Sequence, residues 1–361
     1  MSDKDFDCLV FIGRFQPPHR GHLEVIHQAL AKAHQVIVLV GSAWQARSLR
    51  NPWTFDERSQ MIRACFSDED NARLELVPLL DALYNDDVWV RDVQQKVREL
   101  TRATSQKLPN VALIGAQQSQ SNYFLTLFPQ WQSSSVMPVD GVTSEAIRAP
   151  LFKSMESAMA FLDTAADRTL EAPVANAIEA FLSTPAWQAL HQEHLLLEAY
   201  QSAWRDAPYP PLFVTVNAVV VQSGHVLLVE RRSAPGEGLY ALPGGFVQNH
   251  ERLEDACLRE LRERVRLKVP LPVLKGSLRA QRLFDEPHRS WRGRTLAQAF
   301  YFALRPEQRL PDVRTGQSGH RATWLPLAEL DPEQLFEDHF FIIQSFLGLP
   351  AGFRADSSPG N

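Results

Sequence analysis

Two histidines three positions apart are the first residues whose type and spacing suggest chemistry. His19 and His22 lie in the segment GRFQPPHRGH (residues 13–22), which follows a short apolar run and opens a helical pattern. The free N–H groups and the dipole at a helix N-terminus favour an anion. Imidazoles there can donate hydrogen bonds to phosphate oxygens during group transfer. Two ordinary loop histidines are the alternative, but the strand–turn–helix context favours a phosphate site, with Gly13 for the turn and Gly21 for close backbone approach.

A second candidate site consists of carboxylates on one predicted helix face. Positions 260, 263 and 264 share this face because they are three and four residues apart. Carboxylates so arranged can hold Mg²⁺ against a diphosphate. Residue 264 is an arginine, however. Two unit charges ~4 Å apart interact by ~4 kcal/mol at an effective dielectric of 20, so Arg264 opposes a divalent ion. The carboxylates on this face are Glu260 and Glu263. The candidate site also includes Gly245, Glu251 and Arg259, which precede them in the same segment.

The elements expected to position the first site alternate along residues 1–150. Apolar runs at residues 8–13, 36–41, 74–79, 111–116 and 135–139 are separated by helical patterns. This alternation predicts an α/β, Rossmann-like domain, with a parallel sheet covered by helices on both faces. Ligands bind such sheets beyond the carboxyl ends of the strands. The segment at residues 13–22 follows the first of those ends.

The rest of the chain predicts a helical connector over residues 151–207 and a separate α+β domain over residues 208–350. Pro173 and Pro185 are expected to break the connector helices, and PYPP at residues 208–211 marks the boundary. Strand patterns at residues 213–222 and 225–231 flank Ser223-Gly224, which indicates a hairpin. One helix is expected over residues 252–266. Residues 351–361 are expected to form a flexible tail.

The segment GRFQPPHRGH resembles the signature of the HxGH nucleotidyltransferases, specifically the nicotinamide mononucleotide (NMN) adenylyltransferases. VGS at 40–42, NPW at 51–53, YND at 84–86 and TSEAIR at 143–148 resemble the same family. The resemblance implies that the phosphate of NMN attacks the α-phosphorus of ATP, giving NAD and pyrophosphate. Such catalysis consists mainly of positioning and charge stabilisation. It also implies Mg²⁺ (or Mn²⁺), held largely by substrate oxygens.

The same resemblance assigns roles to individual residues. It implies that His19 and His22 act catalytically on the ATP phosphates and that Arg148 clamps the leaving pyrophosphate. The residues implied in ATP binding are Gly13, Arg14, Phe15, Gly21, Thr143, Ser144 and Ile147. Those implied in NMN binding are Asn51, Trp53, Arg58, Asp81, Tyr84, Asn85 and Trp89. Stacking of Trp53 and Trp89 on the nicotinamide ring competes equally with plain core packing.

Two positions depart from this family in ways that bear on affinity and rate. Glu145 stands where relatives usually have threonine, and a carboxylate near a triphosphate is unfavourable unless it faces away. Gln117-Gln118-Ser119 stands where relatives tend to carry a basic residue and an aspartate.

Residues 245–267 resemble the Nudix hydrolase box, GX5EX7REUXEEXGU with U aliphatic. The resemblance implies metal binding by Glu260 and Glu263, with Arg264 in place of a further carboxylate and Arg266 in place of the box glycine. QSGH at 317–320 stands where relatives have an acidic pair. Five arginines follow the box, at positions 279, 282, 289, 292 and 294, and a guanidinium cluster suits a diphosphate. The expected Nudix ligand contacts are Arg282, Arg292 and Arg294.

The order of motifs resembles the bacterial bifunctional NMN adenylyltransferase/Nudix proteins. We therefore expect NAD synthesis by the first domain, and a Nudix domain related to ADP-ribose pyrophosphatase with weak or lost hydrolysis and a role in nucleotide sensing. A fully bifunctional enzyme is the main alternative. Another HxGH nucleotidyltransferase, using CTP or a different acceptor, and a non-catalytic regulator of NAD metabolism are the others.

Composition sets limits on partners. The formal net charge is −5, and no helix-turn-helix or basic stretch is recognisable, which argues against nucleic acid. The N-terminal apolar run is too short for a signal peptide or membrane span, so we expect a cytoplasmic protein with no membrane partner. Its expected partners are ATP, NMN, NAD and ADP-ribose. A homo-oligomer and the preference between nicotinamide and nicotinate mononucleotides stay open.

Overall fold

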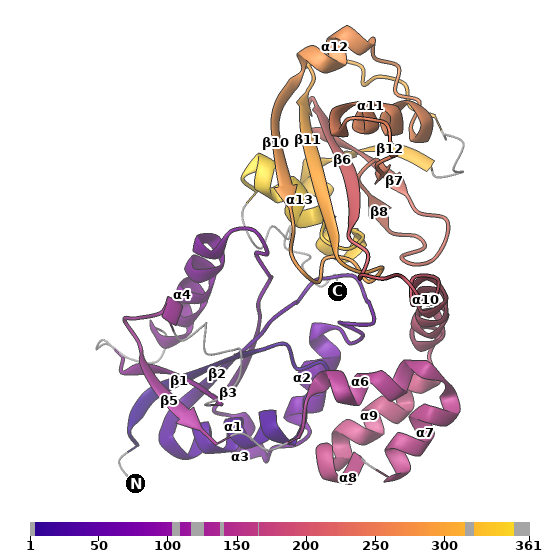
Figure 1. Cartoon of the computed structure of the whole chain (residues 1–361). Coiled ribbons are helices and arrows are strands. Elements are labelled where there is room, and N and C mark those ends of the chain that lie inside the picture. The colour runs from indigo at the N-terminus through magenta and orange to yellow at the C-terminus, as the bar shows by residue number, and fades with distance from the viewer. Residues whose placement is uncertain are drawn as a thin grey trace, which may run out of the picture. The chain divides into compact units, whose positions relative to one another are not determined.

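The computed structural model describes residues 4–102, 109–116, 126–137, 141–164, 166–314 and 321–349. The chain forms two compact units (Figure 1). The first comprises Met1–Ala82 and Asp86–His194, and the second comprises Leu83–Asn85 and Leu195–Asn361. The Gln117-Gln118-Ser119 departure, residues 317–320 and the expected tail at 351–361 lie outside the described residues.

The first unit is built on a parallel sheet in the order β3-β2-β1-β4-β5, which confirms the predicted α/β class. Its first four strands coincide closely with the predicted apolar runs. The fifth begins at Gln132 rather than 135, because its polar residues lie on an exposed edge strand and carry no apolar signal. The strands are β1 (Phe6–Gly13), β2 (Ala33–Val40), β3 (Leu74–Pro78), β4 (Val111–Ala116) and β5 (Gln132–Val136).

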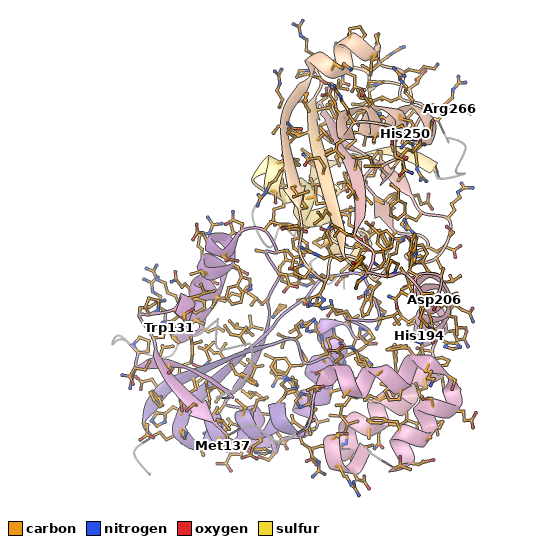
Figure 2. The ribbon with its side chains drawn as sticks, viewed as in Figure 1. Trp131, Met137, His194, Asp206, His250 and Arg266 are labelled. Carbon is orange, nitrogen blue, oxygen red and sulfur yellow. The ribbon has the colours of Figure 1, made fainter. Side chains whose placement is uncertain are left out.

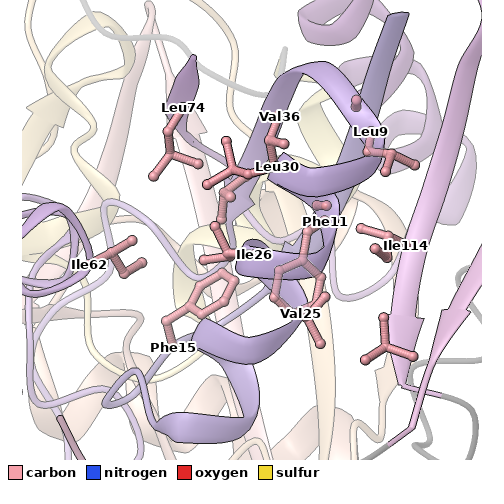
Figure 3. Packing of buried hydrophobic residues seen from close by; sticks show 14 of the residues in the cluster. Leu9, Phe11, Phe15, Val25, Ile26, Leu30, Val36, Ile62, Leu74 and Ile114 are labelled. Carbon is pink, nitrogen blue, oxygen red and sulfur yellow. The ribbon is translucent and has the colours of Figure 1, made fainter. Parts of the chain in front are cut away.

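Helices cover both faces of this sheet because alternate strand residues point to opposite sides. Leu9, Phe11 and Val36 face α1 (Arg20–Lys32) and α2 (Phe55–Arg63) in one core, seen in Figure 3. Cys8, Val10 and Ile37 face α4 (Asp86–Arg102) in the other. A short α3 (Asp68–Asn71) precedes β3. The long α1 helix is therefore anchored along its length, and its N-terminus lies directly after the loop that follows β1.

The predicted helical connector begins within the first unit. Pro173 lies at the start of α9 and Pro185 is the first residue of α10, which confirms both as helix boundaries, where proline is tolerated. The first domain's last helix, α6 (Ser144–Lys153), runs into this region, and the helices that follow are α7 (Met155–Thr164), α8 (Ala166–Thr169), α9 (Ala172–Leu182) and α10 (Pro185–Ser202). No described helix has the length and apolar character needed to cross a lipid bilayer.

The second unit is an α+β domain, as predicted, and its strands form a mixed sheet in the order β10-β11-β6-β7-β12. The β6–β7 hairpin turns at Ser223 and Gly224, both with positive φ, which is the conformation that short hairpins require. The helix α11 packs on the sheet through Cys257, Leu261 and Val265. The strands are β6 (Phe213–Gln222), β7 (His225–Glu230), β8 (Tyr240–Ala241), β9 (Gly244–Phe246), β10 (Leu278–Phe284), β11 (Thr295–Ala303) and β12 (Arg321–Pro326). The helices are α11 (Leu253–Arg264), α12 (Leu271–Gly276), η1 (Leu327–Glu329), η2 (Pro332–Gln334) and α13 (His339–Leu347).

Candidate functional site

The first candidate site is organised around the carboxyl ends of β1, β2 and β3. The Gly41 N–H donates to the carbonyl of Gly13 at 2.8 Å, so the loops that leave β1 and β2 are tied together. Arg58, 1% exposed, donates to the carbonyl oxygens of Arg14, Gly41 and Ser42. Its guanidinium therefore holds these loop carbonyls, a structural role that the sequence did not indicate. NMN binding by Arg58 stays a prediction.

The two histidines lie at the start of α1 with their rings stacked, 3.6 Å apart between centroids. The backbone N–H of His19 donates to Nδ1 of His22 at 3.3 Å. Because Nδ1 is the acceptor, the neutral His22 ring carries its proton on Nε2. Nδ1 of His19 is buried without a hydrogen-bond partner among the described residues. Gly13 permits this packing, because a Cβ there would lie 2.9 Å from the Phe15 ring, which itself contacts His22.

Both imidazoles are neutral at physiological pH. Burial lowers the pKa of His19 to about 4, and burial together with His19 lowers the pKa of His22 well below its usual value. A neutral His22 offers an Nε2–H donor, and the helix dipole adds a positive field. The pair can therefore meet a phosphate without the cost of burying a full charge.

These lowered pKa values predict acid destabilisation of the folded chain. The unfolded histidine binds a proton near pH 6.5 and the folded His19 only near pH 4, so stability falls as the pH drops through this window. For His19 alone, the loss between pH 7.5 and pH 5 is about 2 kcal/mol. Urea unfolding at both pH values should show a smaller loss in His19→Gln than in wild type. His27→Gln, which replaces an exposed histidine of α1, is the control. An unchanged pH dependence in His19→Gln would contradict this prediction.

The segment at residues 143–148 contacts the same loop. Thr143 caps α6 by accepting from the Ala146 N–H, and the Ser144 hydroxyl donates to the carbonyl of Pro17 at 3.1 Å. Arg148 donates to the carbonyl of Gln16. These bonds bring residues 143–148 to the histidine loop, as a shared phosphate site requires. Ile147 is buried beneath them.

Cations gather around Arg148. Burial lowers the pKa of Arg148 to about 10, with further lowering by Arg14 and Arg50, while the exposed Glu145 acts in the opposite direction. The guanidinium groups of Arg14 and Arg50 thus add positive potential at Arg148, which favours an anion there. The sequence motifs did not single out Arg50, because nothing in their spacing marks it.

The NPW segment is fastened to the histidine loop by Gln16, a residue of the GRFQPPHRGH motif to which the sequence assigned no role. The Gln16 side chain donates Nε2–H to the carbonyl of Trp53 at 2.8 Å and accepts from the Trp53 N–H at 3.1 Å. Trp53 is 2% exposed and contacts Phe181 of α9. Among the described residues, neither its indole Nε1 nor Oδ1 of Asn51 has a hydrogen-bond partner. Orphaned buried polar atoms of this kind suit a ligand.

The remaining residues predicted to bind NMN are dispersed. Asp81 accepts from Ser42 and Gln45, at the carboxyl edge of the sheet. Trp89 packs in the α4 core beside Phe128, in the arrangement expected if it serves core packing rather than stacking on nicotinamide. Tyr84 and Asn85 belong to the second unit, where the Tyr84 hydroxyl donates to Asp338. The NMN roles of these residues stay predictions.

The second candidate site lies along α11. His250 precedes this helix and Arg266 follows it (Figure 2). Gly245 lies against the carboxylate of Glu260: a Cβ there would come 2.5 Å from Oε1, so any larger residue would displace this carboxylate. Arg266 has φ +43°, a conformation that glycine adopts readily and arginine adopts at a cost. The backbone therefore explains why the box has a glycine at position 266, and the Glu260 contact explains the one at position 245.

The carboxylates of the box are engaged by arginines. Glu260 accepts from Arg259 through Oε1 and from Arg264 through Oε2, both at 2.6 Å. Glu251 pairs with Arg259, whose hydrogen bonds lower the pKa of that carboxyl to about 2. Glu263 is half-exposed and 3.4 Å from Arg259. Within the described part of the chain, no three metal-ligating side chains converge. As arranged, both carboxylate oxygens of Glu260 accept from guanidinium groups.

The arginines predicted to hold a Nudix ligand have different environments. Arg289, from the same stretch but not among the expected ligand contacts, is buried in a two-bond ion pair with Asp338, at 2.7 and 2.8 Å, so its guanidinium is engaged within the fold. Arg292 lies 3.5 Å from Glu337, and Arg294 donates to the carbonyl of Asp285. The Arg282 guanidinium lies 5.4 Å from the Phe284 ring centroid. Ligand binding by Arg282, Arg292 and Arg294 stays a prediction.

Comparison with known proteins matches each unit to a family. Residues 10–149 match the cytidylyltransferase-like family and residues 211–346 match the NUDIX domain. A nicotinamide/nicotinic acid mononucleotide adenylyltransferase of Acinetobacter baylyi is 46% identical over 126 residues, 35% of this chain and 64% of its own length. A nicotinamide-nucleotide adenylyltransferase of Aeropyrum pernix is 45% identical over 85 residues, 23% of this chain and 49% of its own length. The matched segments thus span about half to two thirds of these relatives.

A solved structure matches both units together. It is a bifunctional NMN adenylyltransferase/ADP ribose pyrophosphatase from Francisella tularensis, complexed with AMP and a manganese ion. The match has a TM-score of 0.83 and 28% identity, and it covers 95% of this chain and 99% of that one. The chain therefore joins a cytidylyltransferase-like domain to a NUDIX domain, and its structure is similar over 95% of its length to that of the bifunctional F. tularensis protein.

Proposed function

We propose that the first unit transfers the adenylyl group of ATP to NMN, forming NAD and pyrophosphate. The observation that carries this proposal is the stacked, neutral pair of His19 and His22 at the start of α1, with Arg148 bonded to the same loop. The A. baylyi and A. pernix relatives carry this activity in their names, which supports the assignment.

In this reaction a phosphate oxygen of NMN bonds to the α-phosphorus of ATP, and the bond from that phosphorus to the bridging oxygen breaks. The Nε2–H of His22 and the N-terminus of α1 donate to the phosphate oxygens as charge builds up. Arg14 and Arg148 offset the charge of the departing pyrophosphate. The donors at this site are cationic or neutral rather than carboxylates, so a Mg²⁺ ion would be held by phosphate oxygens and would neutralise part of their charge.

A substrate panel tests this proposal against its nearest rival. Full-length protein with Mg²⁺ is incubated with ATP or CTP and with NMN or another phosphate acceptor, and the products are separated by chromatography. NAD made only from ATP and NMN is the expected result. A product made from CTP instead, or no dinucleotide from folded protein, would reject the assignment.

For the second unit, we propose a Nudix-fold domain that binds ADP-ribose and hydrolyses it weakly or not at all. The salt bridges of Glu260 with Arg259 and Arg264 support this, because a carboxylate neutralised on both oxygens is a poor ligand for a divalent ion. A fully bifunctional enzyme is the alternative, favoured by the similarity to the bifunctional F. tularensis protein. Incubation with ADP-ribose and Mg²⁺ distinguishes them: we expect binding by calorimetry with little AMP, whereas rapid AMP release would establish bifunctionality.

A further inference from the structure

A chain of side-chain hydrogen bonds links the residues after β3 to the NPW segment. Ser42 donates its backbone N–H and its hydroxyl to the Asp81 carboxylate, at 3.0 and 2.7 Å. Gln45 donates Nε2–H to the same carboxylate at 2.8 Å. Oε1 of Gln45 then accepts from Nδ2 of Asn51 at 3.2 Å. Asp81 is the anchor of this chain because three donors converge on it.

This chain determines which way the Asn51 amide points. An ionised carboxylate only accepts hydrogen bonds, so Gln45 must turn its NH₂ group to Asp81 and its carbonyl to Asn51. Asn51 must then turn its own NH₂ group to Gln45, which leaves Oδ1 for another partner. Asn51 is 9% exposed, and Oδ1 is buried with no partner in the described part of the chain. If the Asn51 amide were reversed, its Oδ1 would face Oε1 of Gln45, and two acceptors would repel each other.

We propose that Gln45 is a specificity-determining residue that acts by positioning: it holds Asn51 Oδ1 as an acceptor and so selects a mononucleotide carrying a carboxamide over one carrying a carboxylate. This inference rests on the proposed NMN adenylyltransferase function. A carboxamide donates an N–H to Oδ1, whereas the carboxylate of nicotinate brings only acceptors and leaves Oδ1 unpaired. The unpartnered indole N–H of Trp53 is a donor that suits the carboxamide oxygen.

The test compares kcat/KM for NMN and nicotinate mononucleotide at saturating ATP. A site built to hydrogen-bond a substrate N–H rejects the analogue that lacks it, so wild type should favour NMN by about 100-fold or more. Gln45→Leu frees the Asn51 amide to rotate. We expect the ratio of kcat/KM for NMN to kcat/KM for nicotinate mononucleotide to fall by about tenfold or more, which corresponds to the loss of one hydrogen bond. KM for ATP should be unchanged. Gln95→Leu, an exposed glutamine of α4 paired with Glu99, is the matched control.

Asn51→Asp is a second variant that does not depend on the folding of Gln45→Leu. Its carboxylate can only accept, so the preference for NMN should persist. A shift of this variant towards nicotinate would overturn the proposal. Equal use of both mononucleotides by wild type would also overturn it, and so would a folded Gln45→Leu variant that keeps the wild-type ratio. Each of these outcomes still leaves the proposed dinucleotide synthesis intact. If wild type makes no dinucleotide from either substrate, the proposed function itself fails.

Discussion

Replacing His22 with alanine is expected to lower kcat of NAD synthesis by about 10²–10³-fold, the usual cost of removing one preorganised donor to a developing oxyanion. His22 has its Nδ1 occupied by the His19 N–H, so its Nε2–H is the donor that remains for phosphate. KM for NMN should change little, because the lost interaction strengthens only as the transition state forms. Steady-state kinetics with ATP and NMN measures both quantities.

The control for His22→Ala is His27→Ala, which removes an exposed histidine from the same helix. It should retain wild-type kcat, and thermal unfolding should show that both variants are folded. A folded His22→Ala with kcat within about threefold of wild type would remove His22 from the chemistry, since a phosphate donor is worth far more.

Replacing Arg264 with glutamate is expected to create hydrolysis in the second unit. Arg264 donates to Oε2 of the buried Glu260 at 2.6 Å, so the substitution removes this cation and adds a carboxylate to the same helix face. The change is worth several kcal/mol for a divalent ion, since one pair ~4 Å apart contributes ~4 kcal/mol at an effective dielectric of 20. We expect measurable Mn²⁺ binding, and release of AMP and ribose 5-phosphate from ADP-ribose at about ten times the wild-type rate or more.

Two variants frame the Arg264 experiment. Arg264→Gln removes the cation without adding a carboxylate, and it should give a smaller gain in Mn²⁺ affinity. Arg262→Glu makes the same charge change at an exposed position of α11 and should leave AMP release at the wild-type level. If folded Arg264→Glu binds no Mn²⁺, then Arg264 is not what prevents metal binding in the second unit.

The sequence predicted most reliably those strands that contain a long apolar run. β1, β2 and β6 were found within a few residues because both their faces are buried and their apolar runs are nearly unbroken. β5 was placed late because an exposed edge strand tolerates Gln132 and the serines after it. The proline boundaries of α9 and α10 were confirmed because proline lacks the N–H that a helix interior needs.

Within the site, motif residues were predictable and their supporting contacts were not. His19 and His22 stack on each other, and Arg148 bonds to the carbonyl of Gln16 in the same loop, while their roles on phosphate stay predictions. Gln16 and Gln45 act through long-range bonds, over 37 and 36 residues, that no local spacing reveals. Arg58 was predicted as a substrate ligand, yet its donors are taken by backbone carbonyls that only the folded loops bring together.

The most direct test of the central claim follows the label from ATP labelled at the α-phosphorus, incubated with NMN, Mg²⁺ and the full-length protein. Adenylyl transfer predicts that the label enters NAD and that unlabelled pyrophosphate appears in equal amount. Label that stays in ATP, or that appears in ADP or AMP without NAD, would contradict the account.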